Sequence, residues 1–203
     1  MKIEITADPG YVDEIVTIHM ETFTGFFLTF LGRGFLRKLY EGFLAHPDSD
    51  VIIALEDGKV VGFCAFSRDL SGFYKYLVKK KLFSFAWYAL GGFLRKPSVF
   101  FRLFRALTYA DKSVREDSYI ELSSIGVSPE HKNEGIGSQL VRKLIELSAS
   151  TEHPYIKLET DRDENAAANH FYQKNGFVLH HSYQTPEGRW MNEYRYDRRE
   201  KHE

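Results

Sequence analysis

The sequence has little cysteine and no long apolar stretch. Only Cys64 is a cysteine, so no disulfide can form within the chain, and a reducing compartment is expected. Cys64 lies in an apolar run, which favours a small buried side chain over a nucleophile. The longest uncharged apolar run spans residues 82–94, well short of the roughly 20 residues that cross a bilayer.

The first residues also lack the basic start and apolar stretch of a secretory signal peptide, so we expect a cytoplasmic protein. With 203 residues, 43% of them hydrophobic and 27% charged, the chain can bury one core without a structural metal. We therefore expect a single domain over residues 1–203.

Acidic residues are absent from residues 71–110, which hold eight Lys or Arg residues and many aromatic ones. Because the net charge of the whole chain is −1, the rest of the chain carries −9. Such an asymmetry suggests a surface with a role of its own.

Hydrophobic periodicity predicts a mixed α/β chain. Strands are expected at 2–6, 51–55, 59–66, 119–127, 155–160, 177–183 and 189–196, and helices at 11–20, 35–46, 135–149 and 165–175. Residues 23–32 are expected to form a loop or a short helical turn, and Asp57-Gly58 a tight hairpin turn.

The segment around residues 119–147 predicts a strand, a glycine-rich loop and a helix, an arrangement that suits phosphate binding. The first helical N–H groups have no partner within the helix and carry partial positive charge. Gly135 and Gly137 lack a Cβ, so a diphosphate could approach the backbone, and the Ser138 hydroxyl could add a donor. Alone, the pattern also fits a turn that binds no ligand.

A second motif follows thirty residues later, where NAAANHFYQKNGF spaces Asn165, Ala168, Phe171, Tyr172 and Gly176-Phe177. With both motifs in this order, the chain resembles the GNAT superfamily of N-acetyltransferases over residues 119–183, and residues 1–68 fit the first half of that family. The resemblance implies a GNAT-like, strongly twisted mixed sheet of about six to seven strands flanked by helices. It also implies acetyl-CoA as co-substrate and a primary amine, on a small molecule or a protein, as acceptor.

The resemblance also implies residue roles. The backbone of Ile125, Gly126 and Val127 would pair with the pantetheine arm of the coenzyme, and Asn165 would bind that arm or the diphosphate. The loop from Lys132 to Gly137 and the start of its helix would hold the diphosphate, through Lys132, Asn133, Glu134, Gly135, Ile136, Gly137 and Ser138. Lys132 stands where the family usually has Arg or Gln, so it keeps the charge but loses the forked donor geometry of Arg.

Acyl transfer to an amine needs a hydrogen-bond donor that stabilises the oxyanion, a proton for the leaving thiolate and a neutral amine. The Val127 N–H is the candidate donor and Tyr172 the candidate acid. The resemblance makes Glu121 the candidate base, because family members with a glutamate base often carry it on this strand. The alternative interpretation is a strand carboxylate paired to Lys or Arg. No His residues combine zinc-ligand spacing with a third ligand nearby in the sequence, so no metal is expected.

Residues 69–117 are expected to form a basic, aromatic helical insertion between the third and fourth strands. Three interpretations stay open: a hairpin packed on the domain or in a homodimer, a lid for an anionic acceptor, and a peripheral membrane contact through residues 73–105. No motif supports nucleic-acid binding. The alternative to an enzyme is a non-catalytic domain of this fold that binds CoA or a membrane surface.

Overall fold

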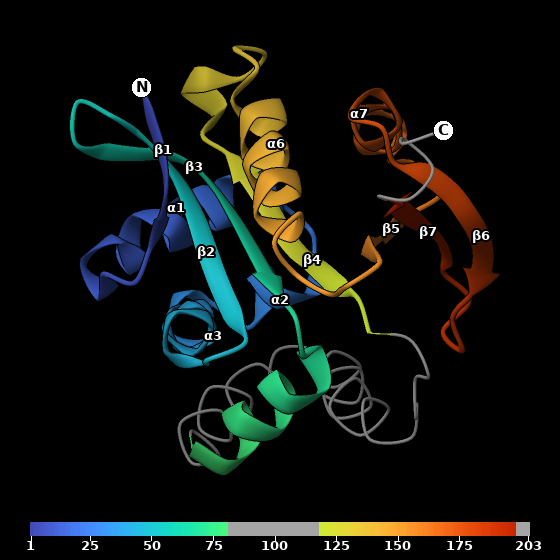
Figure 1. Cartoon of the computed structure of the whole chain (residues 1–203), viewed down its shortest axis with the longest axis horizontal. Helices are drawn as coiled ribbons and strands as arrows, with labels where there is room; N and C mark the ends of the chain where they lie inside the picture. Colours follow the sequence, from blue (N-terminus) through green and yellow to red (C-terminus); the bar gives the residue numbers. More distant parts are fainter. Residues whose placement is uncertain (81–117, 198–203) are drawn as a thin grey trace.

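A computed structural model describes residues 1–80 and 118–197 of the chain (Figure 1). In these residues, seven strands form one sheet in the order β1-β2-β3-β4-β5-β7-β6, in which only the β4–β5 pair is parallel. The strands are β1 (Lys2–Thr6), β2 (Ser49–Glu56), β3 (Lys59–Ser67), β4 (Ile120–Val127), β5 (Tyr155–Asp161), β6 (Val178–Gln184) and β7 (Trp190–Asp197). The predicted mixed sheet is confirmed.

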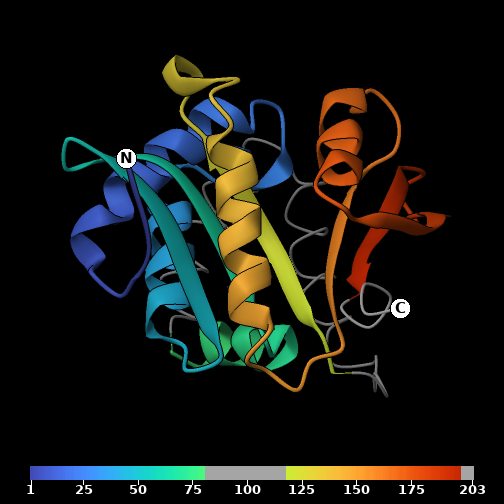
Figure 2. The same cartoon turned by 45° about the horizontal axis from the view of Figure 1, so that its top comes forward.

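Helices cover both faces of this sheet. They are α1 (Val12–Thr22), α2 (Phe27–Phe30), α3 (Arg33–Ala45), α6 (Ile136–Ser148) and α7 (Ala166–Lys174), with 3-10 turns at Pro9–Tyr11 and Pro129–His131. Figure 2 shows α6 in front of the sheet and α1 and α3 behind it. Residues 70–80 are also helical, whereas the rest of the predicted insertion, residues 81–117, lies outside the described residues.

The β2–β3 hairpin closes through a two-residue turn in which both residues adopt positive φ, 50° at Asp57 and 78° at Gly58. Two positive φ angles in succession match the twist of the flanking strands. The predicted hairpin is confirmed.

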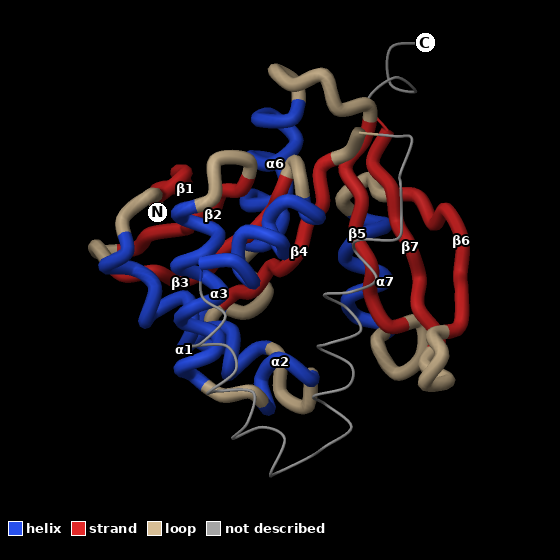
Figure 3. The backbone as a smooth tube through the Cα atoms, turned by 90° about the horizontal axis from the view of Figure 1, so that it is seen from below, coloured by secondary structure: helices blue, strands red, loops and turns tan. Residues whose placement is uncertain are grey.

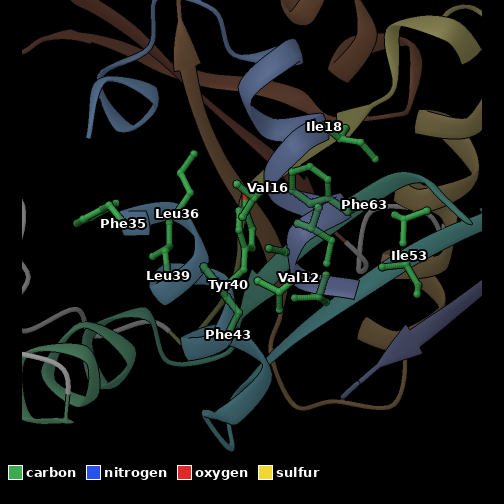
Figure 4. Packing of buried hydrophobic residues seen from close by; sticks show 14 of the residues in the cluster. Val12, Val16, Ile18, Phe35, Leu36, Leu39, Tyr40, Phe43, Ile53 and Phe63 are labelled. Carbon is green, nitrogen blue, oxygen red and sulfur yellow. The ribbon is translucent and has the colours of Figure 1, made fainter. Parts of the chain in front are cut away.

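Buried side chains form a cluster on each face of the sheet. The cluster under α1 and α3 includes Tyr40 and Phe63 (Figure 4). It also includes Phe73 and Leu77 of the 70–80 helix, and Phe73 stacks on Phe43 with ring centroids 4.2 Å apart. The first part of the predicted insertion is therefore core. The cluster under α6 holds Ile136, Leu140, Val141 and Leu144 of that helix.

One extra residue interrupts β4. Ala65 of β3 pairs with Ser124, but Phe66 pairs with Leu122, so Ser123 is a β-bulge. As a result, Leu122 packs in the cluster under α6, whereas the Ser124 hydroxyl lies 3.2 Å from Tyr40 Oη on the opposite face. The bulge thus turns the second half of β4 relative to the first.

Within the described residues, no helix is both long and apolar enough to cross a membrane.

Candidate coenzyme and acyl-transfer site

The central feature of the site is the point where β4 and β5 part. These parallel strands pair at Ile120 with Ile156 and at Glu121 with Lys157, and in the described part of the chain they pair nowhere else. Beyond Glu121 a cleft of about 970 Å³ opens between them. Figure 3 shows β5, β7, β6 and α7 grouped on one side and β1 to β4 with α6 on the other.

Within the described residues, β4 directs backbone N–H groups into this cleft that no neighbouring strand pairs. The Ser128 N–H donates to Val61 O of β3, 2.9 Å away. Backbone groups alternate in direction along a strand, so the N–H groups of Val127 and Ile125 face away from β3, toward the cleft. An extended ligand lying there could pair with them as an added strand would.

The first turn of α6 lies at one end of the cleft. Gly135 is its N-cap, with a left-handed φ of 80°, and no side chain in the described part of the chain caps the helix. The amides of Ile136, Gly137 and Ser138 therefore have no acceptor within the helix, and their partial positive charge suits an anion. Lys132 and Asn133 line the same end of the cleft.

Gly137 is needed for contact between two helices. A Cβ at this position would lie 3.1 Å from Phe171 Cε2 and 3.2 Å from Phe171 Cζ, on α7. At Gly135, by contrast, a Cβ would meet nothing within 4 Å, and the positive φ is what favours glycine. The two glycines of the motif thus serve different purposes.

The structure brings nearly all the predicted coenzyme residues to the cleft. Glu134 is the exception: it is missing from the lining, and its carboxylate lies 3.1 Å from His131 Nδ1. The predicted residues in the lining are Ile125, Gly126, Val127, Lys132, Asn133, Gly135, Ile136, Gly137, Ser138 and Asn165. Asn165 Nδ2 donates to Thr160 Oγ1 at 2.8 Å.

Tyr172 of α7 lines the cleft and packs beside Phe177 and Tyr194, with ring centroids 6.0 and 6.1 Å away. Burial raises its pKa well above the ordinary value, so the phenol stays protonated at neutral pH. Among the described residues, no hydrogen-bond partner occupies its hydroxyl. A protonated, uncommitted hydroxyl can act as a proton donor.

Glu121 lies at the last position where β4 and β5 still pair, and it is missing from the cleft lining. Its carboxylate is 3.7 Å from Lys157 Nζ, which also lies 2.7 Å from Glu159 and 3.7 Å from Glu193. Glu159, two residues further along β5, does line the cleft, and it accepts a hydrogen bond from Tyr183 Oη at 2.5 Å. Sequence reasoning missed Glu159.

The end of the cleft next to α1 has an apolar wall of Phe23, Phe26 and Leu28. In this segment, which was expected to be a loop or a short helical turn, Phe26 and Leu28 thus line the cleft, while Leu31 is core. His19 also lines the cleft, and its Nδ1 lies 2.7 Å from Tyr40 Oη. The same Tyr40 hydroxyl is hydrogen-bonded to Ser124 Oγ, 3.2 Å away. Burial lowers the pKa of His19 to about 4, so the ring is neutral at pH 7.

His19 was not singled out from the sequence. The sequence did hold one signal for it: His19 follows Ile15 by four residues, so it lies on the same buried face of α1 and could have been predicted to be a buried histidine.

The fold also brings together His180, His181 and Glu193, whose potential ligand atoms lie within 4.8 Å of one another. This proximity depends on an irregularity of β6 between Leu179 and His181, which the sequence did not reveal. Glu193 already accepts from Arg195 Nε at 2.7 Å. A cation there would compete with an existing ion pair, so the expectation of no metal is kept as a prediction.

Two parted parallel strands beside an uncapped helix N-terminus define an α/β protein suited to an extended, phosphate-bearing ligand. The model of the acetyltransferase (GNAT) family matches residues 12–177. The chain belongs to this family: it is an acyltransferase that uses acetyl-CoA as co-substrate. The family and the class of activity expected from the two motifs are thereby confirmed.

Solved structures share the fold at low identity. A Desulfovibrio desulfuricans protein described as a GNAT acetyltransferase has a TM-score of 0.65 and 15% identity, over 97% of this chain and 98% of that one. Aminoglycoside 6′-acetyltransferase type Ii has a TM-score of 0.63 and 15% identity, over 97% of each chain. A Salmonella typhimurium protein described as an acetyltransferase, solved with acetyl-CoA, has a TM-score of 0.58 and 15% identity, over 97% and 93%. No curated protein sequence matches the chain.

Proposed function

We propose that this protein transfers an acetyl group from acetyl-CoA to a primary amine, with both substrates bound together in the cleft between β4 and β5. The observation that carries the proposal is the parting of these strands directly after Glu121, between the uncapped start of α6 and Tyr172. This arrangement offers an anion site, an extended backbone edge and a proton donor along one groove.

In this proposal, the α6 amides and Lys132 hold the diphosphate, and the β4 backbone at Ile125–Val127 pairs with the pantetheine arm. The amine nitrogen attacks the thioester carbonyl, and the Val127 N–H stabilises the oxyanion that forms. When the carbon–sulfur bond breaks, the thiolate takes the proton of Tyr172, which solvent then replaces.

The amine must lose a proton before or during attack. Glu121 stays the predicted base, although its carboxylate lies 3.7 Å from Lys157 Nζ and outside the cleft lining. Glu159 is a second candidate because it lines the cleft itself. Because the ordinary pKa of a carboxyl lies far below that of an ammonium, either carboxylate would act through a water or with a pKa raised by burial.

The acceptor is an amine on a small molecule or a protein. Two proteins of this fold act on such groups by name: the aminoglycoside 6′-acetyltransferase, and a ribosomal-protein-S18-alanine N-acetyltransferase from Escherichia coli. Their identity to this chain is too low for either acceptor to be carried over.

The test is a panel of small amines and amino-terminal peptides, with released CoA measured by a thiol reagent and acetyl-CoA binding measured by calorimetry. We expect micromolar to millimolar binding and CoA release with at least one amine. Binding without release from any amine would favour a non-catalytic coenzyme-binding domain. No binding of any acyl-CoA at millimolar concentration would overturn the proposal.

A further inference from the structure

Helix α7 carries Tyr172, yet it has no fully buried residue. Hydrophobic burial alone therefore does not explain how this short helix keeps its place beside the cleft. Asn169, three residues before Tyr172 on the same helix, makes the polar contacts that tie α7 to the sheet.

The Asn169 amide uses both of its ends. Nδ2 donates to Asp161 O at 2.9 Å and to Asn165 O at 2.8 Å. Oδ1 accepts from Asn192 Nδ2 at 2.8 Å and from Tyr194 Oη at 3.0 Å. Four hydrogen bonds satisfy both amide protons and both oxygen lone pairs, so the orientation of this side chain is fixed.

One of these bonds replaces a missing strand contact. The Arg162 N–H donates to Trp190 O of β7, so the backbone groups of the preceding residue, Asp161, face away from β7. In an unbroken sheet the Asp161 carbonyl would be bonded by β4, which has already diverged. Asn169 takes the place of β4 at this carbonyl, at the point where the cleft requires the strands to be apart.

Tyr194 links Asn169 to Tyr172. Its hydroxyl donates to Asn169, and its ring packs beside the Tyr172 ring. A shift of Asn169 would therefore move both the helix that carries Tyr172 and the ring that supports it.

We propose that Asn169 is a positioning residue that anchors α7 to the parted end of β5 and so aims the Tyr172 hydroxyl at the thioester sulfur. This inference rests on the proposed function. It gives a role to a residue that lies within the second motif but is not one of its spaced positions, one that acts through Tyr172 and is missing from the cleft lining.

The experiment combines Asn169→Asp with Tyr172→Phe. Asp has nearly the shape of Asn, but its carboxylate would face the Asp161 and Asn165 carbonyls that Nδ2 now bonds. We expect Asn169→Asp to lower kcat about tenfold or more, since a displacement of about 1 Å can have a large effect on rate. The Kd for acetyl-CoA should change less than kcat does, because the anion site on α6 is untouched and Asn169 reaches the predicted coenzyme residues only through the Asn165 carbonyl.

The double variant distinguishes positioning from general damage. If Asn169 acts through Tyr172, adding Asn169→Asp to Tyr172→Phe should lower kcat by no more than about twofold further. Full additivity of the two losses would overturn the inference, as would an unchanged kcat in Asn169→Asp alone. His170→Ala, an exposed neighbour on the same helix, is the control and should match the parent.

Tyr194→Phe is the substitute if Asn169→Asp fails to fold. It removes only one of the two donors to Asn169 Oδ1. Its combination with Tyr172→Phe should again lower kcat by no more than about twofold beyond Tyr172→Phe alone. Failure of the proposed function would be recognised separately, because the parent itself would then release no CoA from any amine. That result would overturn the inference about Asn169 as well.

Discussion

The ring of Phe171 occupies the space that a side chain at Gly137 would need, 3.1 Å from the position of a Cβ. α6, which offers the anion site, and α7, which carries Tyr172, are therefore in contact across the cleft. In the proposed function, the distance between the diphosphate and Tyr172 would depend on this contact.

We expect Gly137→Ala to push Phe171 and α7 outward. Overpacking of this kind typically costs about 1–3 kcal/mol, and we expect both thermal stability and acetyl-CoA affinity to fall. Differential scanning fluorimetry and calorimetry measure the two effects. Adding Phe171→Leu should restore part of the affinity by making room, and a Gly137→Ala protein with the affinity of the parent would contradict the account.

Gly135→Asp should abolish most acetyl-CoA binding, because it places a carboxylate where the diphosphate is proposed to lie. Gly58 is a matched control: its φ of 78° resembles the 80° of Gly135, and a Cβ at either position meets nothing within 4 Å. Gly58→Asp should therefore lose similar stability, yet bind acetyl-CoA like the parent. Equal losses of affinity in both variants would mean that backbone strain, not charge at the anion site, is responsible.

Tyr172→Phe should lower kcat about 100-fold, the lower end of what general acids contribute, with acetyl-CoA Kd within about threefold of the parent. Burial keeps the pKa of Tyr172 above its ordinary value, so no loss of activity from its ionisation is expected below about pH 10. Steady-state kinetics over pH 6–9 test both statements. A Tyr172→Phe enzyme as fast as the parent would remove Tyr172 as the acid.

Glu121→Gln and Glu159→Gln form a pair that tests the two candidate bases. Glu159 lines the cleft and Glu121 does not, so we expect Glu159→Gln to lower kcat more. The measurement is kcat as a function of pH. Circular dichroism should confirm that both variants fold, because each substitution removes a carboxylate that lies near Lys157 Nζ. A larger loss in Glu121→Gln would support the original prediction for Glu121.

Sequence patterns predicted the local elements well because those depend on nearby residues. The predicted strand 155–160 and helix 165–175 correspond to β5 and α7 within one residue at each end. The order of strands was not predicted: β7 inserts between β5 and β6, a long-range choice that periodicity does not encode.

The placement of Glu121 shows why the site was harder to predict than the fold. The family resemblance placed it on the strand beside the coenzyme, but the strands part only after Glu121, and the bulge at Ser123 turns the rest of β4. Neither event has a local sequence signal.

The insertion shows a similar limit. Its charge and aromatic content set it apart in the sequence, yet Phe73 and Leu77 are core, and a Cβ at Gly42 of α3 would lie 2.4 Å from Leu77. A deletion designed to test membrane contact should therefore begin after residue 80, because removal of residues 73–105 would also remove part of the core.

The final prediction concerns stability and His19. Its pKa is lowered from 6.5 to about 4 by burial, so the unfolded chain binds this proton more tightly than the folded one. The stability contributed by the neutral ring is present in full above about pH 6.5 and is lost as the pH falls toward 4.

Between pH 7 and pH 5 the free energy of unfolding of the parent should therefore fall by about 2 kcal/mol through His19 alone. A variant without this imidazole should not show that part of the decrease. We expect urea unfolding at the two pH values to show a smaller difference for His19→Gln than for the parent. His170→Gln, at an exposed position on α7, should retain the full pH dependence of the parent. If parent and His19→Gln show the same dependence, the His19 ring is not held neutral by its burial beside Phe23 and Tyr40.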